Sequence, residues 1–430
     1  MKPISGSLLS LFFALWSLPV CGQSADDSAS IMISGGRMFE LQAFYATNQD
    51  SMSATMRHYA AAWLYSAFGN GRQACKAFNR LLKRHARALS PAVYARLVQE
   101  LAHVLHRQGR NKQAAKVFRQ YKNDIPPETD SITAIETRRY EELYQAYAAQ
   151  PINLLKRRGD AHIPFRTDSV GTPGHASVAV IIPARLNGTP LEAFFDTGSS
   201  ANILSASLAR RLRLRLMAAR IKIEGMSGVE ARLGIADTLE TGDIVLRNVP
   251  FYIVDTPETA ATDSCSLDRL QFVLGAPWMQ ALGVLKIQMN RRTIVSPAVQ
   301  PTLNAAPNLY YALSSRVLHT QVHHADYTFP VVPDFGASHS VLGRNFMEQH
   351  RDYVAENGRR ARATYGGLGG IAEADAYELY KYDIRFEYLC HIFPAIDVFE
   401  QQTDNLLGMD FFSCFREVIF DLKNMHLSVY

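Results

Sequence analysis

Two short stretches of the chain each place an aspartate between an apolar run and a glycine. The first reads FFDTGSS and contains Asp196, and the second reads VPDFGAS and contains Asp334. Two carboxyl groups held a few ångströms apart share one proton, because like charges at that distance cannot both ionise. The ionised group can take a proton from water while the protonated group gives one to a carbonyl oxygen. Asp196 and Asp334 are therefore candidate catalytic residues for acid–base chemistry that activates water.

The correspondence between these two stretches continues along the chain. Ile203 and Leu204 follow the first aspartate at the spacing at which Val341 and Leu342 follow the second, and an apolar-apolar-glycine element comes later in each half, at 273–275 and 406–408. The residues after each of these glycines also match, with Trp278, Met279, Leu285, Ile287, Met289 and Ile294 corresponding to Phe411, Phe412, Val418, Phe420, Leu422 and Leu427. A duplicated unit of roughly 130 residues explains the pattern.

This duplicated unit resembles the retropepsin-like aspartic proteases, in a form fused into one chain and similar in its two-lobed arrangement to pepsin. In that family D-T-G-[SA]-[ST] opens a catalytic loop, the apolar-apolar-glycine element lies beneath the loop, and a glycine-containing hairpin forms a flap over the cleft. The resemblance covers residues 175–430. It implies two mainly-β lobes of the bilobal acid-protease β-barrel type, at 172–300 and 301–430, in a multidomain α and β protein.

The resemblance also implies roles for individual residues. Asp196 and Asp334 would be the catalytic dyad, one from each lobe. The loops would be supported by Thr197, Gly198, Ser199, Phe335, Gly336 and Ala337. The flaps would contain Gly225, Met226, Ser227, Gly228, Gly367 and Gly369. The implied activity is that of an aspartic endopeptidase acting on an extended peptide or protein substrate, as a monomer and without a metal or cofactor.

The second loop departs from the family pattern at Phe335, where the family has Thr or Ser. In the family that hydroxyl bonds across to the partner loop, and Phe cannot make this bond. Ala337 lacks a hydroxyl that could bond to Asp334, so we expect a dyad less acidic than that of pepsin and a mildly acidic pH optimum. A catalytically inactive bilobal peptide-binding protein is the main alternative function, and a homodimer that pairs two first loops is another.

The region 50–150, which follows a polar stretch, is rich in helix-forming residues and is predicted to form α-helical hairpins. Ala62, Gly69, Gln73, Ala74, Lys76 and Phe78 recur 40 residues later as Ala102, Gly109, Gln113, Ala114, Lys116 and Phe118. This echo resembles tetratricopeptide-type hairpins. The region is either an accessory helical bundle or prodomain, or a groove for a protein partner, and the sequence leaves both open. The glycine-rich segment 171–174 is predicted to mark the break before the first lobe.

The N-terminus is predicted to be an export signal over residues 1–22. Lys2 supplies a positive end, and the apolar stretch 8–20 is too short to span a membrane comfortably. We therefore expect a periplasmic or secreted protein, and favour this over a lipoprotein anchored through Cys21. No second stretch is apolar enough to span a bilayer, and the net charge of +5 is too small to indicate nucleic-acid binding.

Cysteine and histidine usage predicts no metal site. After removal of the signal, Cys390 and Cys414 are the most plausible disulfide pair, with buried free thiols as the alternative. His323 and His324 have no partner at metal-ligand spacing and are predicted to face solvent in a loop.

Overall fold

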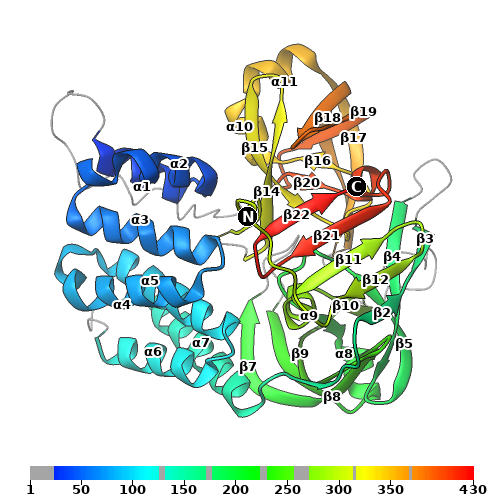
Figure 1. Cartoon of the computed structure of the whole chain (residues 1–430), viewed down its shortest axis with the longest axis horizontal. Coiled ribbons are helices and arrows are strands. Elements are labelled where there is room, and N and C mark those ends of the chain that lie inside the picture. The colour runs from blue at the N-terminus through cyan, green and yellow to red at the C-terminus, as the bar shows by residue number, and fades with distance from the viewer. Residues whose placement is uncertain are drawn as a thin grey trace, which may run out of the picture.

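A computed structural model of the chain describes residues 24–124, 131–170, 177–222, 230–255, 271–312, 316–367 and 370–430. The predicted signal segment 1–22 lies outside the described residues. Figure 1 shows helices stacked along one side of two β-rich lobes, the second lobe above the first. The predicted fold class, helices followed by two β-rich lobes, is confirmed.

The N-terminal region consists of paired helices. These are α1 (Ala25–Ser34), α2 (Met38–Asn48), α3 (Ala54–Ala67), α4 (Gly71–Arg84), α5 (Pro91–Arg107), α6 (Asn111–Asp124) and α7 (Ser131–Ala149), with short 3-10 turns η1 (Gln49–Ser51) and η2 (Ala86–Ala88). Ser24, Ser53 and Ser90 cap α1, α3 and α5, since each side chain accepts a hydrogen bond from a backbone N–H of the first turn. The helices begin at Ala25, earlier than predicted.

The early helices were not predicted, although α2 is rich in apolar residues and its Met38 and Leu41 are fully buried. The echo in the sequence has a structural counterpart. Gly69 and Gly109 occupy equivalent hairpin turns at φ of +73° and +71°, a left-handed conformation that glycine adopts without strain. Phe78 and Phe118 are both buried one helix later. The two hairpins α3–α4 and α5–α6 therefore repeat one structural unit.

The first lobe is built from the strands that precede residue 300. They are β1 (Asn153–Lys156), β2 (Ala161–Pro164), β3 (Arg166–Val170), β4 (Ser177–Leu186), β5 (Thr189–Phe195), β6 (Ile203–Ser205), β7 (Arg215–Lys222), β8 (Glu230–Thr241), β9 (Ile244–Val254), β10 (Phe272–Leu274), β11 (Val284–Gln288) and β12 (Thr293–Ser296), with helices α8 (Ala206–Arg211) and α9 (Ala276–Leu282). The main sheet has the order β1-β9-β6-β10-β5-β4-β8-β7, with β3 beside β4.

Strands thus begin before the lobe boundary predicted at residue 172. The glycine-rich segment 171–174 connects the antiparallel neighbours β3 and β4, so it joins strands within one sheet instead of separating two domains. The segment itself lies outside the described residues. Its glycines indicate a break in regular structure, and such a break is equally compatible with a hairpin connection.

The second lobe has a similar plan. Its strands are β13 (Tyr310–Tyr311), β14 (Leu318–His324), β15 (Tyr327–Pro333), β16 (Val341–Leu342), β17 (Gly358–Gly367), β18 (Gly370–Phe386), β19 (Leu389–Phe399), β20 (Leu406–Leu407), β21 (Glu417–Asp421) and β22 (His426–Val429), with helices α10 (Arg344–Gln349), α11 (Arg351–Asn357) and α12 (Met409–Phe412). The main sheet has the order β13-β14-β15-β20-β16-β19-β18-β17.

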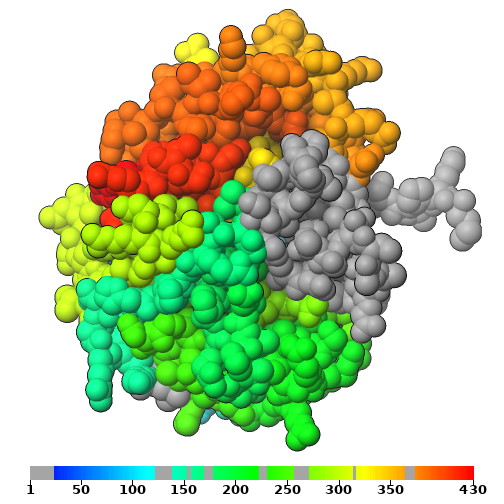
Figure 2. All heavy atoms as spheres, turned by 90° about the vertical axis from the view of Figure 1, so that its right-hand side faces the viewer, coloured from blue at the N-terminus to red at the C-terminus, as the bar shows by residue number. Residues whose placement is uncertain are grey.

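A third sheet joins the lobes in the order β2-β12-β11-β21-β22. Figure 2, which views the face turned away from the helices, shows β11 and β12 of the first lobe beside β21 and β22 of the second. Leu285 pairs with Phe420 and Ile287 pairs with Val418. Because Leu285 corresponds to Val418 and Ile287 to Phe420 in the duplicated sequence, this crossed pairing relates the two lobes by an approximate twofold axis.

The helical region packs against both lobes. Ala219, Leu233 and Ile235 of the first lobe and Tyr310 of the second belong to the same buried cluster as the helices. The Tyr310 hydroxyl donates to the Gly36 carbonyl at 3.2 Å. These contacts attach the helical region to both lobes through buried side chains.

The cysteine and histidine predictions need correction. Cys390 and Cys414 are free and exposed, and the Cys414 thiol donates to the Asp410 carbonyl within its own turn. His323 and His324 lie on β14 and not in a loop; His323 is exposed, as predicted, whereas His324 is buried against Tyr353 and Asp383. Among the described residues, no helix is long and apolar enough to cross a membrane.

Candidate active site

Equivalent strands deliver the two aspartates to the centre of the molecule. Asp196 follows the buried end of β5, and its N–H donates to the Leu274 carbonyl of the neighbouring parallel strand β10. Asp334 follows β15, and its N–H donates to the Leu407 carbonyl of β20 in the same way. The apolar-apolar-glycine elements therefore lie directly beside the aspartate loops, as the sequence correspondence predicts.

The two loops interlock through their glycines. The Gly198 N–H of the first loop donates to Asp334 Oδ1 at 3.2 Å, and the Gly336 N–H donates to the same oxygen at 2.7 Å. A Cβ atom at Gly198 would lie 2.5 Å from Cγ of Asp334, and one at Gly336 would lie 2.5 Å from Cγ of Asp196. Since real Cβ atoms do not approach so closely, only glycine allows each loop to pass over the carboxylate of the other.

The two carboxyl groups are close enough to share a hydrogen bond, and their environment differs. Burial raises the pKa of Asp196 well above its ordinary value, and the Asp334 charge raises it further. Burial also raises the pKa of Asp334, but hydrogen bonds from Gly336, Asp196 and Gly198 oppose this shift. The shared proton therefore resides on Asp196 and the negative charge on Asp334. Asp196 Oδ1 is buried and has no hydrogen-bond partner among the described residues.

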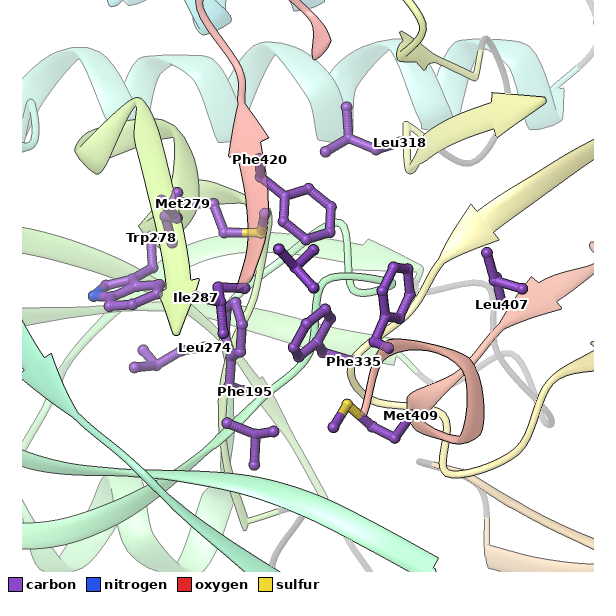
Figure 3. Close-up of a cluster of buried hydrophobic side chains, with 14 of the residues drawn as sticks. Phe195, Leu274, Trp278, Met279, Ile287, Leu318, Phe335, Leu407, Met409 and Phe420 are labelled. Carbon is purple, nitrogen blue, oxygen red and sulfur yellow. The ribbon is translucent and has the colours of Figure 1, made fainter. Parts of the chain in front are cut away.

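Thr197 links the loops from one side only. Its hydroxyl donates to the Pro333 carbonyl at 2.6 Å and accepts from the Phe335 N–H at 2.8 Å. Phe335 offers no hydroxyl in return, and its ring is fully buried in the core behind the loops (Figure 3). The predicted loss of the reciprocal bond is thus visible in the geometry.

The remaining predicted support residues act through the backbone. The Ser199 carbonyl accepts from the Ala276 N–H, and the Ala337 carbonyl accepts from the Met409 N–H. The Ser199 hydroxyl donates to the Ala201 carbonyl at 2.8 Å, so this hydroxyl serves its own loop. Both loops are in this way tied to the helix that follows each apolar-apolar-glycine element.

Sequence reasoning missed polar residues that brace each loop from below. Asn202 Oδ1 accepts from the Gly275 N–H at 3.0 Å, and Ser340 Oγ accepts from the Gly408 N–H at 2.9 Å. Asp410 accepts from both the N–H and the hydroxyl of Ser340. Asn202 and Ser340 stand at the same spacing from their aspartates. Their equal spacing could have predicted a shared role, but the two residue types differ.

The residues predicted to form the flaps fall largely outside the described residues. Residues Gly225, Met226, Ser227 and Gly228 lie outside the described residues, between the antiparallel strands β7 and β8. Gly367 ends β17 and pairs with Gly370 of β18, while Gly369 lies outside the described residues. Among the described residues, no group of three or more metal-ligating side chains could hold a metal ion.

Residues 182–278, from β4 to α9, match the family model described as aspartyl protease. The matched segment contains the Asp196 loop, β10 and the glycine that follows it. This match and the interlocked loops make the chain similar to the aspartyl proteases. No curated protein matches the chain.

Proposed function

We propose that the chain is an aspartic endopeptidase in which Asp196 and Asp334, one from each lobe, activate a water molecule. The interlocked glycine loops carry this proposal, because they hold two carboxyl groups within hydrogen-bonding reach in a buried setting. A buried pair with unequal pKa values provides one acid and one base at the same pH.

The chemistry follows from the two environments. The Asp334 carboxylate takes a proton from water, whose oxygen forms a bond to the peptide carbonyl carbon. Asp196 gives its proton to the carbonyl oxygen, which yields a neutral tetrahedral gem-diol. The C–N bond then breaks as the amine nitrogen receives the proton held by Asp334, and a gem-diol proton returns to Asp196. Protons balance, and no covalent enzyme intermediate forms.

The surrounding elements support an extended peptide as substrate. The antiparallel pairs β7–β8 and β17–β18 support this substrate class, because a peptide bound under flaps carried by these strands would pair through its backbone like an added strand. We further propose that the protein acts as a monomer, because both loops come from one chain, and that it is exported through segment 1–22.

Cleavage of a diverse peptide mixture across pH 3 to 8, a range set about the ordinary carboxyl pKa values, tests the proposal. The purified protein should cut at mildly acidic pH, and Asp196→Asn should lower kcat by more than about 1000-fold. Asp352→Asn, an exposed aspartate on α11, is the matched control and should be unaffected. Peptide binding without cleavage at any pH would instead indicate an inactive bilobal binder.

A further inference from the structure

Phe335 occupies the position in the second loop that Thr197 occupies in the first. Thr197 uses its hydroxyl to bond the opposite loop, whereas the Phe335 side chain has no polar atom. On hydrogen bonding alone, the second loop would be held less firmly than the first. The packing around the Phe335 ring shows a different kind of link between the loops.

The Phe335 ring is 0% exposed and lies among aromatic side chains from both lobes. Its centroid is 5.7 Å from that of Phe195 in the first lobe. It stacks on Phe412 of α12 at 5.0 Å and lies 5.9 Å from Phe420 of β21 in the second lobe. Aromatic pairs at these distances are attractive in addition to their burial of apolar area.

This cluster continues through the junction of the lobes. Figure 3 shows Phe335 between Phe195 and Ile287, on one side, and Leu407 and Met409, on the other. All of these residues belong to one buried core that contains side chains from both lobes. The ring is therefore anchored to both halves of the molecule at once.

The buried Phe335 ring lies next to the backbone segments that carry Asp196 and Asp334. Phe335 lies between Asp334 and Gly336 in the chain, and Gly336 passes over the Asp196 carboxylate. Phe195, the ring's partner in the first lobe, directly precedes Asp196. The contact between Phe195 and Phe335 thus joins the residues next to the two aspartates, immediately beneath the carboxyl groups.

We propose that Phe335 is a positioning residue whose buried ring replaces the missing second hydroxyl bond and fixes the spacing of Asp196 and Asp334. The inference rests on the proposed function, because the distance between the two carboxyl groups decides whether they share a proton. A ring that only filled space would affect stability, whereas a positioning ring also affects the acid–base behaviour of the pair.

The test compares Phe335→Leu and Phe335→Thr with Phe346→Leu. Phe346 is a matched control, because it is equally buried in the second lobe and its ring packs on Phe329 and Tyr382, which are not residues of the aspartate loops. We expect the Phe335 variants to lower kcat by about 10- to 100-fold with KM within about threefold, and to shift the limbs of the pH–rate profile. Phe346→Leu should lower Tm comparably and leave the profile unchanged.

Phe335→Thr is the most informative variant, because it restores the hydroxyl that the family pattern expects. Wild-type kcat and an unchanged pH profile in this variant would overturn the proposal. If it fails to fold, Phe195→Leu probes the same contact from the first lobe and should shift the profile in the same way.

A second readout separates this inference from the proposed function. Asp196→Asn should change the pH dependence of Tm, and this change should shrink in the Phe335→Leu background, where the carboxyl groups can move apart. If the wild-type protein cuts no peptide but this coupling is present, the proposed activity fails and the positioning role stands. Additive effects of the two substitutions on Tm would contradict the positioning role.

Discussion

At the scale of single residues, the dyad is asymmetric although the lobes are duplicated. Asp334 accepts hydrogen bonds from the Gly198 and Gly336 N–H groups, whereas Asp196 Oδ1 has no partner among the described residues. Hydrogen bonds to a carboxylate favour its charged form, so they direct the proton to Asp196. The division into acid and base therefore follows from burial and the neighbouring Asp334 charge, which raise the Asp196 pKa, together with the hydrogen bonds that favour the charged form of Asp334.

The raised pKa of Asp196 predicts that Asp196→Asn stabilises the protein at neutral pH. A carboxyl group whose pKa is raised by folding stabilises the folded state below its ordinary pKa, here 3.8, and loses this contribution as the pH rises through the folded pKa. Asparagine cannot ionise, so it removes the cost of keeping this carboxyl group protonated at neutral pH. Thermal unfolding should give a higher Tm for Asp196→Asn than for wild type at pH 7, and a smaller difference near pH 4. A lower Tm at pH 7 would contradict the assigned direction of the shift.

Thr197→Val should be costly, because Thr197 is the one loop hydroxyl that bonds both the Pro333 carbonyl and the Phe335 N–H. Leaving these buried groups without a partner should cost about 2 to 4 kcal/mol in the free energy of unfolding, measured in urea. Thr197→Ser keeps the hydroxyl and should stay within about 1 kcal/mol of wild type. Equal stability of the Val and wild-type proteins would show that the bonds contribute little.

At the scale of elements, each aspartate loop depends on the parallel strand beside it and on the glycine that lets the opposite loop approach. Gly336→Ala should therefore abolish activity, since its Cβ would lie 2.5 Å from Cγ of Asp196. We expect a loss of more than about 100-fold in kcat/KM, because misplacement of a reacting group by about 1 Å is sufficient for such a loss.

Gly109→Ala provides the comparison for the Gly336→Ala measurement. Gly109 has a φ of +71° with no atom near the position of a Cβ, so alanine there should lower stability but leave kcat/KM unchanged. An active Gly336→Ala protein would mean that the loops are not held as closely as described.

The elements also show how far the sequence alone allowed prediction. The aspartate loops, β10 and β20 were predictable, because each short motif occurs twice in the chain at matching spacing. The start of the first lobe was not, since β1 and β2 are short and pair with β9 and β12, which lie far along the chain. The role of Phe335 was also hidden, because its partners Phe195, Phe412 and Phe420 meet it only in the folded chain.

At the scale of the whole molecule, the helical region is joined to both lobes by buried contacts. The Arg107 guanidinium of α5 lies over the Tyr311 ring at 4.4 Å, and Arg316 lies over the Tyr140 ring of α7 at 5.3 Å. Because these contacts attach the helices to the lobes, we favour an integral scaffold over a free groove for a protein partner.

A double-mutant cycle with Arg107→Leu and Tyr311→Leu tests this docking. Desolvated cation–π pairs contribute about 1 to 2 kcal/mol, so the two substitutions should show a coupling of that size in the free energy of unfolding. Arg110→Leu, an exposed arginine in the turn after α5, should show no coupling to Tyr311→Leu. Independent unfolding of the helices before the lobes would argue against one integral body.

The central claim is that the two loops form one catalytic site, and the direct measurement is the kcat of Asp334→Asn beside that of Asp196→Asn on the same peptide. We predict that both fall by more than about 1000-fold, because neither carboxyl group can serve as acid and base alone. An Asp334→Asn protein that cuts at close to the wild-type rate would contradict the claim, and would point to pairing of first loops between two chains.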